Sequence, residues 1–125
     1  MIWLVVGAGA AAGGMARHAL NQLVHQRTLA GTFPLGIFLI NVIGSGVIGL
    51  LAGLVAANRL QLSEQTRTFV FVGVLGGFTT FSSFSLDTLA LARDGHVAQA
   101  AANVVGQVGL SLLAVWAGYR AGVLA

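Results

Sequence analysis

Four long apolar stretches, separated by short polar connectors, limit what this chain can fold into. They cover about residues 2–24, 34–57, 68–92 and 97–119. Each is long enough for a membrane-spanning helix, which needs about 20 mainly apolar residues. The first stretch carries one basic residue, Arg17, and the third carries one acid, Asp87. The sequence therefore predicts an all-α integral membrane protein with four transmembrane helices, in a single domain over residues 1–125.

The composition agrees with a surface that faces lipid. Charged residues make up 7% of the chain and hydrophobic residues 57%, whereas a soluble domain carries roughly 25% charged residues. The six basic residues are scattered singly, so nucleic-acid binding is a poor interpretation. The absence of cysteine excludes disulfides and thiolate metal sites. No nucleophile–base pair, metal-ligand set or phosphate loop points to an enzyme.

The arginines divide evenly between the two sides of a four-span bundle. Arg59, Arg67 and Arg120 lie on the side of the termini, and Arg17, Arg27 and Arg93 lie on the other. The positive-inside rule needs an excess on one side to set the orientation. We therefore expect a chain that inserts both ways up, with a single, weakly encoded orientation as the alternative.

Pairs of small residues four positions apart recur along the spans. They are Gly9/Gly13, Ser45/Gly49, Gly49/Gly53, Gly73/Gly77 and Gly118/Gly122. Such pairs let helix backbones approach closely in lipid, although glycine is common in membrane helices generally. They predict tight helix packing. Separately, four helices are barely enough to enclose a polar path within one chain, so a path for a solute is expected to need more than one chain.

The third span contains a double glycine followed by two threonines, in the stretch GVLGGFTTFSSFSLD from Gly73 to Asp87. Glycine costs about 1 kcal/mol in a helix relative to alanine, and threonine hydroxyls compete for backbone groups. A break near Gly76 and Gly77 would free carbonyl oxygens, which are hard ligands suited to hard cations. The alternative, a continuous helix with packed glycines, is equally compatible with the sequence.

Aromatic and hydroxyl side chains alternate after the threonines. On a helix Phe81 and Phe84 share one face, and Ser82 and Ser85 share another, with Ser83 between them. A phenyl ring has a positive edge, which would attract an anion weakly in a narrow path. Ordinary core or lipid-facing phenylalanines are the alternative.

Uncharged polar residues also lie within the spans. Asn41 offers two N–H donors in mid-span, suited either to an anion that sheds water or to an interhelical hydrogen bond. Asn103, Gln107 and Ser111 recur every fourth residue and form one polar stripe. Arg17 either reaches the interface or raises the local anion concentration at a pore mouth.

Three motifs together resemble those of one family, the Fluc/CrcB fluoride channels. GGFTTFSSFSLD is similar to the signature of that family's third helix. NVIGSGVIG resembles its second-helix motif, and GAAAGGMARH resembles its glycine-rich first helix that ends in arginine. The resemblance covers almost the whole chain in length, number of spans and spacing.

The resemblance implies an assembly that spacing alone does not show. Members of the family form antiparallel homodimers from one dual-topology chain, with two fluoride pathways along the dimer interface. Their broken third helices hold a central structural Na⁺ through backbone carbonyls, which by position are those of Gly76 and Thr79 from each chain.

The resemblance also implies which side chains face the pathways. They are Phe81 and Phe84, with Asn41 close by, Ser111 on the fourth helix and Arg17 near the vestibule; we add Ser82 and Ser83 to the same pathway. The chain departs from the family pattern at three positions. Ser83 replaces a usual threonine and Asp87 a more frequent glutamate, while Val115 offers no hydroxyl one turn beyond Ser111.

The expected function is passive, selective export of F⁻ from the cytoplasm through the cell inner membrane, which relieves fluoride toxicity. Na⁺ would be a structural cofactor that is not transported. A small proton-coupled multidrug-type exporter is one alternative, although the first span lacks the carboxylate that such an exporter needs. A non-transporting membrane scaffold is another, but it would not explain the Thr-Thr-Phe-Ser-Ser-Phe series.

Overall fold

The computed structural model describes residues 1–125 and is entirely helical. Its elements are α1 (Ile2–Arg27), α2 (Leu35–Ala56), α3 (Glu64–Arg67), η1 (Thr68–Leu75), α4 (Gly76–Phe78), α5 (Phe81–Arg93) and α6 (Val97–Leu124). The elements α3, η1 and α4 follow one another without a gap, and η1 is a π-helical stretch. The predicted all-α fold is confirmed, and the elements from α3 to α5 together form the third apolar stretch.

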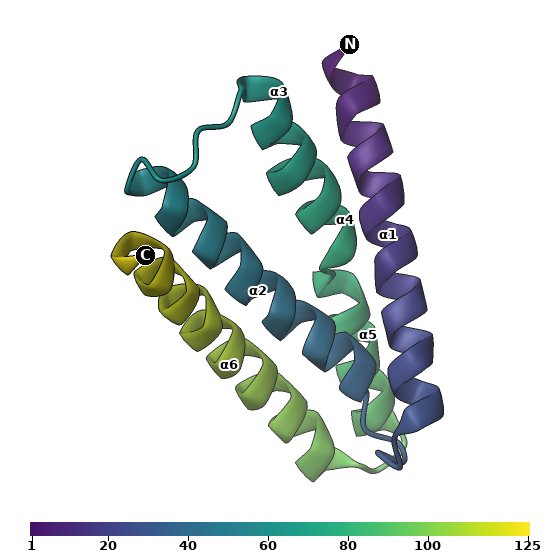
Figure 1. Ribbon diagram of the computed structural model, residues 1–125. Helices are drawn as coiled ribbons and strands as arrows, with labels where there is room; N and C mark the ends of the chain where they lie inside the picture. Colours follow the sequence, from purple (N-terminus) through teal and green to yellow (C-terminus); the bar gives the residue numbers. More distant parts are fainter.

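The long helices run up and down the molecule alternately. In Figure 1, α1 and the third stretch descend, whereas α2 and α6 ascend side by side. The helix α1 begins and α6 ends in the upper half of that view, so both termini point the same way. This arrangement agrees with an even number of membrane crossings.

Three of the predicted spans are long and apolar enough to cross a membrane. They are Leu35–Ala56, Glu64–Arg93 and Val97–Leu124. The helix α1 has 26 residues, about 39 Å at the usual rise, but its C-terminal half carries Arg17, His18 and Asn21 among other polar residues. The crossing by α1 therefore stays a prediction.

Little of the chain is buried, and much of the exposed surface is apolar. Only 17 of the 125 residues are buried, which is too few for a water-soluble core of this length. On α6 the outward-facing side chains include Val105, Leu112 and Trp116, each exposed over more than half of its surface. Such a surface is stable in lipid, where apolar side chains meet an apolar solvent.

Close helix contacts form at the small residues that the sequence singled out. A Cβ on Gly9 of α1 would lie 2.9 Å from the Gly73 Cα of η1, and a Cβ on Gly77 would lie 2.9 Å from the Ala10 Cα. Gly49 of α2 and Gly118 of α6 are covered by each other's helix backbones in the same way. The prediction of tight glycine-mediated packing is confirmed at both helix pairs.

The third stretch is broken near its centre, at Thr79 and Thr80 rather than at the double glycine. Thr79 (φ −84°, ψ 160°) and Thr80 (φ −156°, ψ 115°) are extended, whereas Gly76 keeps helical angles (φ −64°, ψ −35°). Gly77 packs against Ala10 from within the helix. The predicted break is thus present, two residues after Gly77, and the alternative of a continuous helix is wrong, although the glycine does pack against a neighbouring helix.

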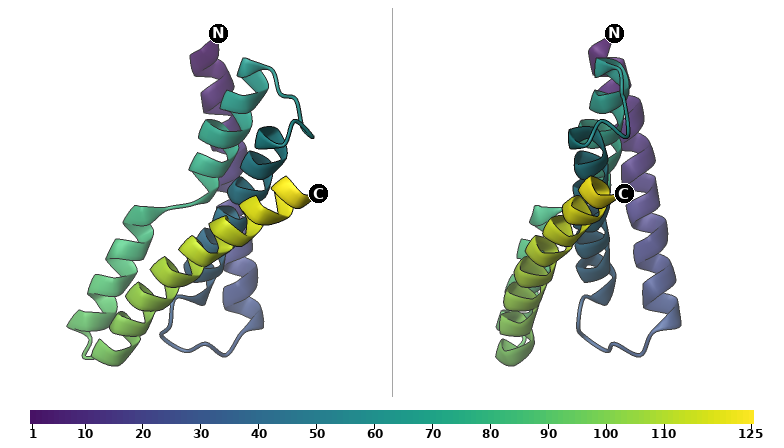
Figure 2. Two further views of the ribbon diagram at one scale, coloured as in Figure 1. Left: turned by 90° about the vertical axis from the view of Figure 1, so that its left-hand side faces the viewer. Right: turned by 60° about the vertical axis from the view of Figure 1, so that its left-hand side comes forward.

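The break shifts the third stretch sideways. Its first half, η1 and α4, packs on α1, and its second half, α5, packs on α6. Figure 2 (left) shows the extended link that joins the two halves. The Thr80 hydroxyl caps the second half by accepting a 3.1 Å hydrogen bond from the Ser83 N–H.

Candidate functional site

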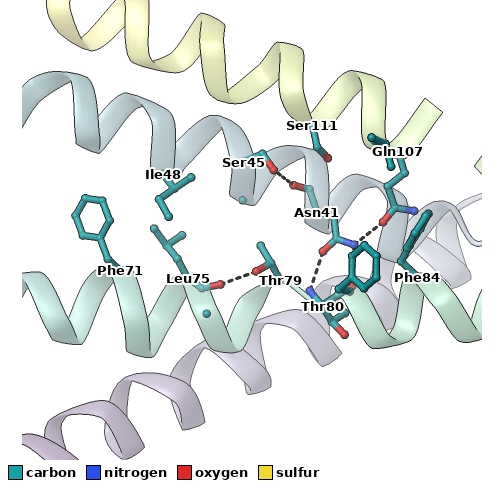
Figure 3. A pocket seen from close by; sticks show the side chains of 14 residues that line it. Asn41, Ser45, Ile48, Phe71, Leu75, Thr79, Thr80, Phe84, Gln107 and Ser111 are labelled. Atoms are coloured by element: carbon teal, nitrogen blue, oxygen red, sulfur yellow. Dashed lines mark hydrogen bonds between the residues drawn. The ribbon is translucent and has the colours of Figure 1, made fainter. Parts of the chain in front are cut away.

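A cavity of about 340 Å³ lies at the level of the break, between α2, α6 and the two halves of the third stretch (Figure 3). Its lining residues are Asn41, Gly44, Ser45, Ile48, Phe71, Leu75, Gly76, Thr79, Thr80, Phe81, Phe84, Gln107, Val108 and Ser111. No charged side chain is among them. Four of the residues predicted for the pathway, Asn41, Phe81, Phe84 and Ser111, therefore meet in one place.

The side chain of Asn41 satisfies the backbone of the break. Asn41 Oδ1 accepts from Thr80 N–H at 2.8 Å, and Asn41 Nδ2 donates to the Thr80 carbonyl at 3.0 Å. Asn41 lies 39 residues before Thr80 on a different helix. Because freed backbone groups are costly in an apolar interior, this pair explains how the extended residue is tolerated there.

A chain of side-chain amides leads away from the break along α6. Asn41 Nδ2 also donates to Gln107 Oε1 (Figure 3). Gln107 Nε2 donates to Asn103 Oδ1 at 3.0 Å, and Asn103 Nδ2 donates to Thr88 Oγ1 at 3.0 Å. Asn103 is fully buried and Gln107 is 3% exposed. The polar stripe predicted on α6 is thus an interior stripe.

The hydroxyl groups around the cavity differ in whether they have a hydrogen-bond partner. Ser45 Oγ donates to the Asn41 carbonyl at 2.7 Å, and Thr79 Oγ1 donates to the Leu75 carbonyl at 3.0 Å. Ser111 Oγ is buried and has no hydrogen-bond partner. A buried hydroxyl normally finds a partner, so Ser111 leaves an unused donor in the wall of the cavity.

The two phenylalanines contact each other at the side of the cavity. The ring centroids of Phe81 and Phe84 are 5.3 Å apart, with the rings tilted by 52°. Phe84 is buried, whereas Phe81 is 77% exposed. The cavity is therefore open to the outside of the single chain next to Phe81.

Ser82 and Ser83, which we predicted on the pathway, do not line the cavity. Both hydroxyls contact the Thr80 hydroxyl, at 3.1 Å for Ser82 and 3.2 Å for Ser83. They belong to the first turn of α5, which the Thr80 hydroxyl caps. Their assignment to the pathway stays a prediction.

Arg17 reaches the break from α1. Its Nη1 donates to the Thr79 carbonyl at 3.3 Å. Arg17 does not line the cavity, so its contribution to a vestibule stays a prediction. The guanidinium instead satisfies a backbone oxygen of the break, one residue before the residue that Asn41 binds.

The two carbonyls expected to hold Na⁺, those of Gly76 and Thr79, differ in their hydrogen bonding. In a continuous helix the Thr80 N–H would bond the Gly76 carbonyl, but it donates to Asn41 instead, so the Gly76 oxygen is freed. The Thr79 oxygen accepts from Arg17. Carbonyl oxygens are the donor type that a hard cation prefers, and the freed Gly76 carbonyl fits that role within this chain.

A second cavity of about 250 Å³ lies between the end of α1, the connector before α2 and α5. Asp87, Asn21 and His25 are among its lining residues. Asp87 Oδ2 is buried without a hydrogen-bond partner. The acid of the third-helix motif is therefore separate from the cavity at the break.

Gln107 and Asn103 belong to the site although neither was assigned to it from the sequence. Their four-residue spacing with Ser111 predicted a buried polar face, but it did not show what that face meets. The hydrogen bond from Asn41 to Gln107 joins residues 66 positions apart. Only the packing of α2 beside α6 brings them together.

The fold and this cavity define a multi-pass membrane protein with a polar site at a helix break. The family model described as "CrcB-like protein, Camphor Resistance (CrcB)" matches residues 4–119. The chain belongs to this family.

Relatives in the family align with the chain over nearly its whole length. One from Paramagnetospirillum magneticum, named fluoride-specific ion channel FluC, is 48% identical over 125 residues, covering 99% of this chain and 97% of the relative. A second, from Opitutus terrae and of the same name, is 49% identical over 123 residues, covering 98% and 92%. A third, from Rhodospirillum rubrum, is 45% identical over 125 residues, covering 99% and 96%.

Proposed function

We propose that this chain is a fluoride-selective ion channel that passively exports F⁻ from the cytoplasm and so relieves fluoride toxicity. The observation that carries the proposal is the near full-length identity of 45–49% to relatives named fluoride-specific ion channels. The cavity at the break supports it, because it combines uncharged donors with phenyl rings and has no carboxylate to repel an anion. The protein is a channel and not an enzyme.

The transport mechanism follows from the chemistry of fluoride. HF crosses a membrane as a neutral acid and dissociates in the more neutral cytoplasm, which traps F⁻ inside. The negative interior then drives F⁻ outward by about 2.3 kcal/mol per 100 mV. F⁻ is small and strongly hydrated, so the path has to replace water with donors, which the amides, hydroxyls and phenyl edges around the break supply. No energy coupling is required.

The proposal includes an antiparallel, dual-topology homodimer in the inner membrane, with two pores along the dimer interface. Two features of the single chain support it. The arginines divide evenly between the two sides, and the cavity is open beside Phe81, which is 77% exposed. A second copy on that face would close the cavity and bury the ring.

Na⁺ would be held by the carbonyls of Gly76 and Thr79 from each chain, and it would add fixed positive charge near the anion path without itself moving. The freed Gly76 carbonyl supports this assignment. The Thr79 oxygen also accepts from Arg17, whose positive charge opposes a cation at the same oxygen.

The exporter alternative is less compatible with the site. Proton-coupled export of a cationic drug needs a carboxylate in the transport path, and Asp87 lines the second cavity rather than the first. The experiment that tests the proposal is ion efflux from liposomes that contain the purified protein, with fluoride and chloride loaded in parallel. Fast fluoride loss with chloride retained supports the channel, and retention of both ions by folded protein contradicts it.

A further inference from the structure

The cavity at the break has two unlike ends. At one end the backbone of the break meets the Asn41 amide, so this end is polar. Ile48 lies seven residues further along α2, about 10 Å away at the usual helical rise. The wall there is formed by Ile48, Phe71 and Leu75, whose side chains have no polar atom. Figure 3 shows Phe71 at one end of the cavity, away from Asn41.

The apolar end points toward the side of the molecule on which the termini lie. Phe71 belongs to η1, which begins directly after α3. In Figure 1, α3 lies at the same end of the molecule as the first turn of α1. A path that continues from the break past Ile48 therefore approaches the membrane surface on the side of the termini.

A positive charge lies against the Phe71 ring. The guanidinium carbon of Arg67 is 5.9 Å from the centre of this ring, within the range of a cation–π contact. Arg67 is exposed and makes no side-chain hydrogen bond within the chain, so its N–H donors are free. The ring therefore holds a free guanidinium beside the apolar end of the cavity.

Two other arginines with known surroundings are placed differently. Arg17 donates to the Thr79 carbonyl, at the break itself. Arg59 lies in the connector between α2 and α3, and it neither lines the cavity nor stacks on a ring. Arg67 thus differs from Arg59, its neighbour on the side of the termini, by its contact with a residue of the cavity wall.

We propose that Arg67 is a further residue of the anion pathway, which attracts the anion to the Phe71 end of the cavity, and that Phe71 positions its guanidinium there. The inference rests on the proposed channel function. The apolar end offers an anion no donor in its own wall, so a nearby fixed charge raises the local anion concentration at that end. A guanidinium that is stacked on a ring and weakly hydrated supplies this charge in a fixed place.

The test measures the initial rate of fluoride efflux from liposomes at two ionic strengths. Fluoride is kept well below its half-saturating concentration, so that entry of the anion limits the rate. The two ionic strengths are about 0.01 M and about 1 M, at which charges act over about 30 Å and about 3 Å. N-methyl-D-glucamine gluconate supplies the difference, so the Na⁺ concentration stays constant.

Arg67→Gln is expected to lower the rate about three- to fivefold at low ionic strength, the scale of one unit charge about 4 Å from the ion in water. At high ionic strength its rate should approach that of the wild type, because salt screens the missing charge. Arg67→Lys keeps the charge and should keep most of the salt dependence. Arg59→Gln is the matched control, since it removes the same charge from the same side and should leave the rate unchanged.

Phe71→Leu tests the positioning role. It keeps an apolar side chain in the cavity wall but removes the ring beneath the guanidinium. We expect Arg67→Gln to have a clearly smaller effect on the low-salt rate in the Phe71→Leu background than in the wild type, because the two residues act together. Equal effects in both backgrounds would show that Phe71 does not position Arg67.

The outcomes separate this inference from the proposed function. If the wild-type protein carries no fluoride, the channel proposal itself fails. If the wild type carries fluoride and Arg67→Gln behaves as Arg59→Gln does at both ionic strengths, the channel stands and the assignment of Arg67 is overturned. A loss of flux in Arg67→Gln that is the same at both ionic strengths also overturns it, because such a loss is structural rather than electrostatic.

Discussion

Asn41 on α2 and Thr80 in the break of the third stretch are joined by two hydrogen bonds, of 2.8 Å to the Thr80 N–H and 3.0 Å from Asn41 Nδ2 to the Thr80 carbonyl. One side chain thereby replaces both helical partners of an extended residue. It also frees the Gly76 carbonyl and donates to Gln107 Oε1. Much of the proposed site therefore depends on this pair.

Asn41→Asp is expected to abolish fluoride flux. A carboxylate has no donor for the Thr80 carbonyl or for Gln107 Oε1, so it sets oxygen against oxygen at both and adds a negative charge beside the anion. Liposome efflux measures the effect. Asn58→Asp, in the turn after α2, makes the same chemical change away from the cavity and should keep wild-type flux. Retained flux in Asn41→Asp would remove Asn41 from the site.

Phe81→Ile and Phe84→Ile are each expected to lower fluoride flux, by about five- to tenfold, the scale of a contact with an aromatic ring. The assembly state should not change, which size-exclusion chromatography of the purified variants can check. Phe69→Ile on η1 is the control, since Phe69 does not line the cavity. Wild-type flux in both cavity variants would refute a role for these rings in the pathway.

Gly9→Ala is expected to destabilise the bundle by about 1–3 kcal/mol, the usual cost of overpacking. A Cβ at this position would lie 2.9 Å from the Gly73 Cα, which is closer than two carbon atoms can pack, so α1 has to move away from η1. Gly7→Ala is the control on the same helix, because nothing lies within 4 Å of its Cβ. Thermal unfolding in detergent compares the two, and equal melting temperatures would contradict the packing argument.

A reporter fused after Ala125 is expected on both sides of the membrane. The reason is the even division of arginines, which gives insertion no preferred orientation. Adding two lysines to the connector around Arg59 should bias the reporter to the cytoplasmic side. A one-sided result for the unaltered chain would disprove dual topology.

Removal of Na⁺ is expected to lower fluoride flux if the Gly76 and Thr79 carbonyls hold the ion. Liposomes are prepared with sodium salts or with N-methyl-D-glucamine, a cation too large for a carbonyl site, and fluoride efflux is compared. Arg17→Met should reduce the Na⁺ concentration needed, since it frees the Thr79 oxygen. Equal flux in both salts would exclude a structural contribution from Na⁺.

The sequence by itself determined the features that depend on neighbours along the chain. Apolar length defined the helices α2 and α6 and the third stretch to within a few residues, because lipid requires about 20 apolar positions in a row. The spacing of small residues identified the packing faces. The spacing of Asn103, Gln107 and Ser111 identified a polar face on α6. The Gly-Gly-Phe-Thr-Thr run indicated, to within two residues, where a break would fall, but it left a continuous helix equally possible.

The tertiary structure decided everything that depends on a partner from another helix. The break falls at Thr79 and Thr80 because Asn41 from α2 and Arg17 from α1 satisfy the freed backbone groups there. Both N–H hydrogens of the Asn41 amide have acceptors within the protein, because Thr80 accepts one and Gln107, 66 residues away, accepts the other. A polar group in an apolar interior takes whichever partner the packing brings to it, and residue spacing along one helix carries no information about that partner.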